Sequence, residues 1–135
     1  MTPDDRYLEV RQALDQFLAA FGALDFERFA GSFAQNAETC IILPAPAQRL
    51  IYRGWTAARQ AWLEVFEHER AASPDGRLRL EISDLDIQVF GESALATFLV
   101  NSLPPAVMHR RTIVFAKQAG RWQIVHLHGS NHDPT

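Results

Sequence analysis

The sequence predicts an α+β fold in which a curved antiparallel sheet of five or six strands wraps around three N-terminal helices. Apolar residues recur every three or four positions over much of the first half of the chain, and every two positions from Arg77 onward. In the first predicted strand of this second half, the apolar positions are even-numbered before Ser83 and odd-numbered after Asp84. This change predicts a bulge that bends the strand. A sheet bent in this way closes around helices as a cone and leaves an apolar pocket at its open end.

The N-terminal segment is expected to be a helix that runs to Gly22. Thr2 is a suitable N-cap, Pro3 suits the first helical position, and acidic residues follow where the helix end is positive. Asp25 is expected to cap a short second helix. Apolar residues form one stripe on the first helix, namely Tyr7, Val10, Leu14, Phe17, Leu18 and Phe21, and the second segment carries Phe26, Phe29 and Phe33.

A β-hairpin and a third helix are expected next. Residues 39–43 form an apolar run typical of a strand, which ends at the prolines of residues 44–46. Residues 50–52 are expected to be the second strand of the hairpin. The third helix is expected to begin after Gly54, with one apolar side, and to end at residues 73–76, which read SPDG.

Three long strands are expected from Arg77 onward, with breaks at residues 91–93, at Pro104-Pro105 and at residues 118–120. The first of them carries the parity change. Its apolar positions are even before the predicted bulge and odd after it, namely Leu78, Leu80, Ile82, Leu85, Ile87 and Val89.

Composition excludes several classes of partner. The 135 residues suit a single domain spanning residues 1–135, and 47% apolar content supports a core. A net charge of −3, without a basic cluster, argues against nucleic acid. A lone cysteine, an acidic N-terminal segment and the lack of a long apolar run predict a cytoplasmic protein that does not enter the membrane. No P-loop or dinucleotide-binding glycine pattern is present, so no cofactor is expected.

The order of elements resembles the nuclear transport factor 2-like superfamily, above all its SnoaL-like branch. The letters that carry the resemblance lie in residues 24–37, 52–54 and 110–130. The closing run GRWQIVHLHGS, residues 120–130, is also similar to the end of the calcium/calmodulin-dependent kinase II association domain. In that domain the position of Gly129 is a pocket arginine, so an anionic ligand would need another cation here.

The resemblance implies two function classes. One is an isomerase, cyclase or dehydratase that acts on a small apolar carbonyl compound without a metal or nucleotide. The other is a non-catalytic ligand-binding or oligomerisation module. The usual ketosteroid isomerase residues are absent, since Ile41 stands for the base, Phe17 for the oxyanion-hole tyrosine and Thr112 for the second acid. We therefore do not expect a ketosteroid isomerase.

Candidate catalytic residues are Arg110, Tyr52 and His109. A guanidinium or phenol can polarise a carbonyl or hold an oxyanion. Strand alternation puts either Arg110 with Thr112, or His109 with Arg111, toward the pocket; the resemblance favours the first pair, and a bulge would reverse the choice. Tyr52 and Trp55 also suit the core. The expected ligand-binding residues are Phe17, Ile41, Tyr52, Trp55, Trp62, Asn101, Arg110, Thr112, Val125 and Leu127.

His126 and His128 are two residues apart on a predicted strand and therefore point to one face, with Trp122 and Ile124. Two imidazoles can begin a zinc site, but a third ligand such as His109 or His132 would have to come from elsewhere. We favour a homodimer contact made by Trp122, Ile124, His126 and His128, with no metal. In that case Gln123, Val125 and Leu127 face the pocket.

Overall fold

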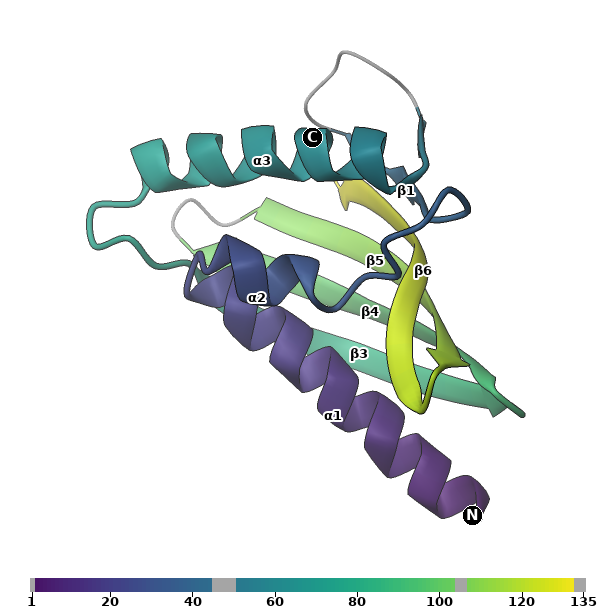
Figure 1. Ribbon diagram of the computed structural model, residues 1–135. Helices are drawn as coiled ribbons and strands as arrows, with labels where there is room; N and C mark the ends of the chain where they lie inside the picture. Colours follow the sequence, from purple (N-terminus) through teal and green to yellow (C-terminus); the bar gives the residue numbers. More distant parts are fainter. Residues whose placement is uncertain (1, 45–50, 104–106, 133–135) are drawn as a thin grey trace.

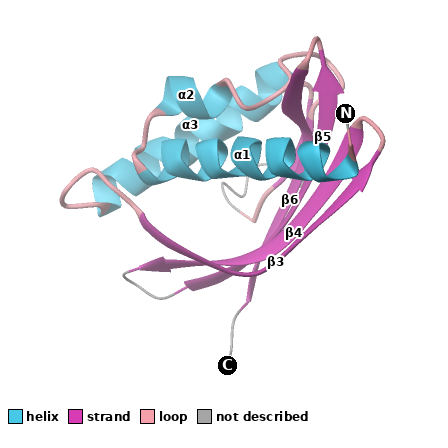
Figure 2. Cartoon of the chain, turned by 90° about the horizontal axis from the view of Figure 1, so that it is seen from below, coloured by secondary structure: helices cyan, strands magenta, loops and turns pink. Residues whose placement is uncertain are grey.

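The computed structural model describes residues 2–44, 51–103 and 107–132 and confirms the α+β prediction (Figure 1). The described residues form three helices and six strands, and the six strands make one sheet with the order β2-β1-β6-β5-β4-β3. All three helices cover the same face of this sheet, which curves around them (Figure 2). The elements are α1 (Pro3–Gly22), α2 (Phe26–Ala30), β1 (Cys40–Ile42), β2 (Tyr52–Arg53), α3 (Trp55–Ala72), β3 (Arg79–Phe90), β4 (Ser93–Leu103), β5 (Val107–Gln118) and β6 (Arg121–His132).

The helix starts follow the predicted capping chemistry. Thr2 Oγ1 accepts a hydrogen bond from the Asp5 backbone N–H at 3.2 Å, and the Asp5 carboxylate accepts one in return from the Thr2 backbone N–H. Asp25 Oδ1 accepts from the Arg28 backbone N–H at 3.3 Å. Gly54, with φ of 85°, sits just before α3, in a conformation that favours glycine.

The sheet contains the predicted hairpin and four long strands, one more than expected. Cys40 of β1 pairs with Arg53 of β2 in antiparallel register, and strands β3 to β6 are antiparallel neighbours. Three breaks after residue 77 delimit four segments, and each segment forms a strand. The β1 strand lies parallel to β6, with Cys40 opposite His126, and this pairing joins the hairpin to the end of the chain.

Two bulges determine which side chains face the helices. The predicted bulge in β3 is confirmed, because the register shifts between Ser83 and Asp86 and Asp84 has φ of 52°. A second bulge, which we did not predict, lies at Val125: Ile124 pairs with Phe115, and His126 pairs with Val114. The positions of β6 that face the helices are therefore even-numbered before Val125 and odd-numbered after it.

An aromatic cluster fills the space between the helices and the sheet. The ring of Phe29 lies 4.8 Å from those of Trp62 and Phe66 and 5.0 Å from that of Phe17, measured between centroids. Phe29 and Phe66 are fully buried. Burial of each such side chain stabilises the fold by about 1.5–3 kcal/mol. Within the described part of the chain, no helix is both long and apolar enough to cross a membrane.

Candidate functional site

A cavity of about 650 Å³ lies between the helices and the concave face of the sheet. Its wall is formed by the three helices, by the residues that follow β1 and by strands β3 to β6, where the start of β5 meets the ends of β4 and β6. Much of the lining is aromatic or aliphatic, and it includes Phe17, Phe21, Phe29, Phe98, Val100 and Leu127. Such a cavity can take the apolar body of a small molecule.

Arg111 is the arginine that β5 places in this cavity wall, and the expected inward orientation of Arg110 and Thr112 is wrong. Ile113 and Phe115 are buried against the helices, so alternation along the strand turns Arg111 and His109 to the same side. Arg110 is exposed and donates a hydrogen bond from Nη2 to the backbone oxygen of Asn131 at 3.2 Å.

The Arg111 guanidinium lies across Gly129, its partner in register on β6. A Cβ atom on Gly129 would stand 2.5 Å from Nη1 and 2.9 Å from Cζ of Arg111, so a side chain there would displace the guanidinium. Glycine at position 129 thus makes room for the arginine of the neighbouring strand.

The positive charge of Arg111 has no carboxylate counter-ion among the residues that the structure describes. Its hydrogen bond from Nη1 goes to the backbone oxygen of Arg110 at 3.1 Å. Among the described residues, no carboxylate lies within ion-pair distance of its guanidinium. Burial lowers the pKa of Arg111 to about 10, so the group is still positive at neutral pH. A desolvated cation of this kind favours an anionic or strongly polar oxygen beside it.

His109 lines the same cavity and is held by Asn131. The two residues are partners in register on β5 and β6, and His109 Nδ1 lies 2.6 Å from Asn131 Oδ1. Because a carbonyl oxygen only accepts, Nδ1 carries the proton and Nε2 of the neutral ring keeps its lone pair. Burial lowers the pKa of His109, and the charge of Arg111 adds to the effect; Asn131 and Glu69 act in the opposite direction.

The remaining predicted pocket residues divide between the cavity and its surroundings. Phe17, Trp62 and Leu127 line the cavity, as expected. Ile41 and Tyr52 are buried in the core, and Trp55 packs against Phe33 at 5.3 Å between ring centroids. Three of the remaining four expected ligand residues lie on the helix-free side of the sheet or at the β6 bulge, namely Asn101, Thr112 and Val125.

The four residues of the expected dimer face do not share one face. Trp122 and Ile124 are buried against the helices, whereas His126 and His128 lie on the other side of β6. The bulge at Val125 is the cause, because it changes the parity between the two pairs. Over residues 2–44, 51–103 and 107–132, no three His, Cys, Asp or Glu side chains come together as a metal site would need.

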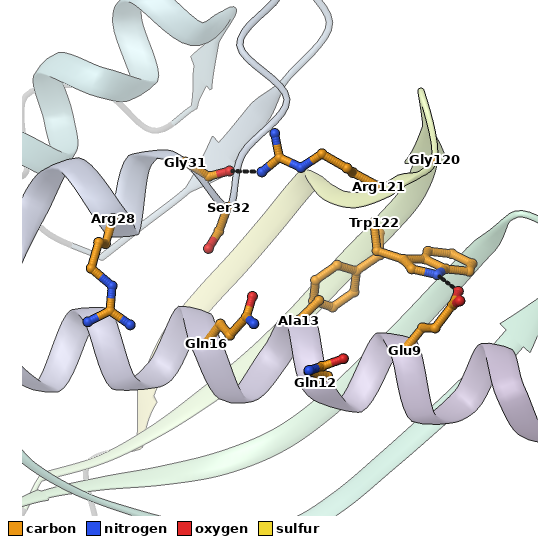
Figure 3. Close-up of a pocket in the computed structure, with 11 residues that line it drawn as sticks. Glu9, Gln12, Ala13, Gln16, Arg28, Gly31, Ser32, Gly120, Arg121 and Trp122 are labelled. Atoms are coloured by element: carbon orange, nitrogen blue, oxygen red, sulfur yellow. Dashed lines mark hydrogen bonds between the residues drawn. The ribbon is translucent and has the colours of Figure 1, made fainter.

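A second cavity, of about 570 Å³, lies on the other side of α1 (Figure 3). Trp122 Nε1 donates a hydrogen bond to Glu9 Oε1 at 2.7 Å, and Lys117 Nζ lies 3.3 Å from the same oxygen. Arg121 donates from Nη2 to the backbone oxygen of Gly31 at 3.3 Å. These bonds attach the β5–β6 turn to α1 and to the end of α2, which is a structural role.

The sequence left Arg111 as the less favoured of two inward arginines, and it did not indicate Asn131 as a site residue. Ile113 and Phe115 are bulky apolar residues of β5 and are expected to face the core. Since side chains alternate along a strand, Arg111 is expected on the same face, so the sequence held a signal for it. Asn131 carried none, because only the pairing of β5 with β6 places it opposite His109.

Comparisons with solved structures show the same fold in several proteins from bacteria. A nuclear transport factor 2-like protein of unknown function from Pseudomonas putida is 21% identical over 96% of this chain and 89% of its own, with a TM-score of 0.80. A protein from Streptomyces avermitilis, named as a dehydratase of that family, is 20% identical over 98% and 99%, with a TM-score of 0.76.

A third structure, from Thiobacillus denitrificans and named for a calcium/calmodulin-dependent protein kinase type II association domain, is 22% identical over 90% of this chain and 93% of its own, with a TM-score of 0.71. At these identities the likeness concerns the fold. No protein with a curated description matches the sequence. The model of the SnoaL-like domain matches residues 10–134, so the chain belongs to the SnoaL-like domain family.

Proposed function

We propose that the protein binds a small organic molecule whose apolar body occupies the 650 Å³ cavity and whose anionic or carbonyl oxygen meets Arg111. One observation carries this proposal: the Arg111 guanidinium lies in a largely apolar wall and has no carboxylate partner among the described residues. A partly buried charge without a carboxylate partner is costly, and a ligand oxygen offsets that cost.

The aromatic side chains of the wall favour a ligand with an aryl or alkyl body. Phe17, Phe21 and Phe98 line the cavity together with Leu127. Burial of apolar ligand surface against them supplies affinity, while hydrogen bonds to a charged donor contribute about 1.5–3 kcal/mol and supply orientation.

A matched pair of probes tests the proposal. 3-Phenylpropanoate and 3-phenylpropan-1-ol have the same apolar body and differ in the oxygen group. Isothermal titration calorimetry is expected to show tighter binding of the acid. Arg111→Met is expected to weaken binding of the acid by about tenfold or more, because charge-assisted hydrogen bonds are lost, and to leave binding of the alcohol nearly unchanged.

Arg110→Met is the matched control, since Arg110 lies on the same strand and is exposed outside the cavity. An equal loss in both variants would assign the effect to general charge. Failure of the acid to bind the wild-type protein, or equal binding of the acid by wild type and Arg111→Met, would contradict the proposal.

Enzymatic activity as an isomerase, cyclase or dehydratase on a small apolar carbonyl compound is an extension of this proposal. The observation in its favour is the His109–Asn131 pair in the same cavity wall.

We also propose a homodimer that forms through the helix-free face of the sheet. His126, Leu99 and Val114 lie on that face and are partly buried. A carboxylate introduced by His126→Asp would be desolvated in such a contact, so this variant is expected to be monomeric by light scattering at micromolar concentration. A monomeric wild-type protein under the same conditions would contradict the dimer.

A further inference from the structure

We infer that His109 is a general base that removes a proton from a carbon next to a carbonyl group of the bound molecule, with Asn131 as its positioning residue. This inference rests on the proposed function, because it uses the same cavity and assigns Arg111 to the oxygen on which charge develops. The substrate class is a small carbonyl compound with an apolar body and an enolisable C–H bond.

The hydrogen bond between His109 and Asn131 is the first support. Nδ1 of His109 lies 2.6 Å from Asn131 Oδ1, and Arg110 donates to the backbone oxygen of the same asparagine at 3.2 Å. Asn131 is therefore held by two contacts from β5. A ring that donates through Nδ1 presents Nε2 as its acceptor, which is the atom that a base requires.

The position of His109 relative to Arg111 is the second support. The two residues are two apart on β5 and line the same cavity, so their Cα atoms lie about 7 Å apart along the strand. A carbonyl oxygen at the guanidinium can thus have its neighbouring carbon near the imidazole. A cation beside the oxygen stabilises the enolate in the step that the base performs.

Burial and the charge of Arg111 keep the His109 ring in its basic form. Burial is the largest cause of its lowered pKa and Arg111 on β5 adds to it, while the hydrogen bond with Asn131 on β6 and the charge of Glu69 on α3 act in the other direction. The ring is therefore neutral at pH 7, as a general base must be before it accepts a proton.

The chemical step balances without a co-reactant. The C–H bond next to the carbonyl breaks, and its proton goes to His109 Nε2. Its electron pair forms the C=C bond of the enolate, while the carbonyl π pair moves to the oxygen at Arg111. In D2O the imidazolium exchanges this proton for a deuteron of the solvent and delivers the deuteron to the same carbon, which gives hydrogen exchange. Delivery of the proton to a conjugated carbon instead gives isomerisation.

Phenylpyruvate in D2O is the test, since it carries a carboxylate, a carbonyl group and an enolisable CH2 on an aryl body. Proton NMR measures the loss of the CH2 signal through exchange. The wild-type protein is expected to accelerate exchange above the buffer rate. His109→Gln is expected to lower the accelerated rate by about a hundredfold or more, which is the usual contribution of a general base.

Variants of Asn131 test its positioning role. Asn131→Leu is expected to reduce exchange while binding of 3-phenylpropanoate stays unchanged. Asn131→Asp keeps an oxygen acceptor for Nδ1–H, so exchange is expected to persist; the added carboxylate raises the pKa of His109 and moves the pH profile upward. His128→Gln, outside the cavity on the other face of β6, is the control and is expected to leave exchange unchanged.

The outcomes separate this inference from the proposed function. Binding of 3-phenylpropanoate that depends on Arg111, without any accelerated exchange of phenylpyruvate, overturns the general base and leaves the binding site standing. Equal exchange by wild type and His109→Gln also overturns it. Nitrogen NMR gives a readout that needs no probe: the Nδ1–H tautomer of His109 is expected at pH 7, and an Nε2–H tautomer overturns the inference.

Discussion

The guanidinium of Arg111 occupies the space above Gly129, the residue that faces it across β5 and β6. Strand β5 therefore supplies the cation of the cavity, Arg111, and Gly129 of the neighbouring strand β6 leaves the space that its guanidinium occupies. Glycine at position 129 is a requirement of the site rather than of a turn, since its φ does not lie in the left-handed region.

Gly129→Ala is expected to damage ligand binding more than stability. The new Cβ would stand 2.5 Å from Arg111 Nη1, so the guanidinium moves, as the end of a flexible side chain can. Binding of 3-phenylpropanoate is expected to fall toward that of Arg111→Met, while the free energy of unfolding changes by about 1 kcal/mol or less. Unchanged binding, measured by calorimetry, would contradict the assigned position of Arg111.

Acidification is expected to destabilise the protein through two histidines. The pKa values of His109 and His126 are lowered in the folded protein, mainly by burial, from a reference value of 6.5. Below about pH 6.5 the unfolded chain therefore binds more protons than the folded one, and stability falls as the pH decreases. Urea unfolding at about pH 7.5 and about pH 5.5 measures the loss.

The double variant His109→Gln/His126→Gln is expected to reduce this pH dependence. His132→Gln, at an exposed position, serves as the control. A urea midpoint that rises on acidification, or a dependence that the double variant leaves unchanged, would contradict the role of the two rings.

Trp122→Phe is expected to loosen the attachment of α1 to the β5–β6 turn. The indole N–H donates to Glu9 at 2.7 Å and is the main cause of the lowered pKa of that carboxyl group. Carbon NMR is expected to show a higher pKa of Glu9 in the variant, and urea unfolding a lower midpoint. Trp55→Phe, a tryptophan on α3 that does not contact Glu9, is the control, and an unchanged Glu9 pKa in Trp122→Phe would contradict the assignment.

Phe29→Ala is expected to be among the most destabilising single substitutions in the core. Phe29 is fully buried, and its ring packs against those of Phe17, Trp62 and Phe66. Loss of such a side chain costs about 3–5 kcal/mol through lost burial and the void left behind. Urea unfolding with an unchanged m-value measures the cost, and a loss below about 1 kcal/mol would show that the cluster does not behave as a packed core.

The helices and the first bulge were predictable because their signals are local. The sequence predicts Thr2 and Asp25 as helix N-caps, and both residues cap helices in the structure. The change of parity at Ser83 and Asp84 is visible within one strand and does not depend on its neighbours. The second bulge was not predictable in this way, since apolar Val125 fits an unbroken strand and only the pairing of β6 with β5 shows it to be extra.

The sequence by itself determined the helices, the strands, the curvature of the sheet and the family resemblance, because periodicity and capping act over a few neighbouring residues. Tertiary structure decided which strand faces form the cavity. A shift of one residue in β6 moves Trp122 and Ile124 into the core and leaves His126 outside, and the register of β5 against β6 joins Arg111 to Gly129 and His109 to Asn131. Side chains alternate with a period of two, so one unpaired residue reverses every assignment beyond it.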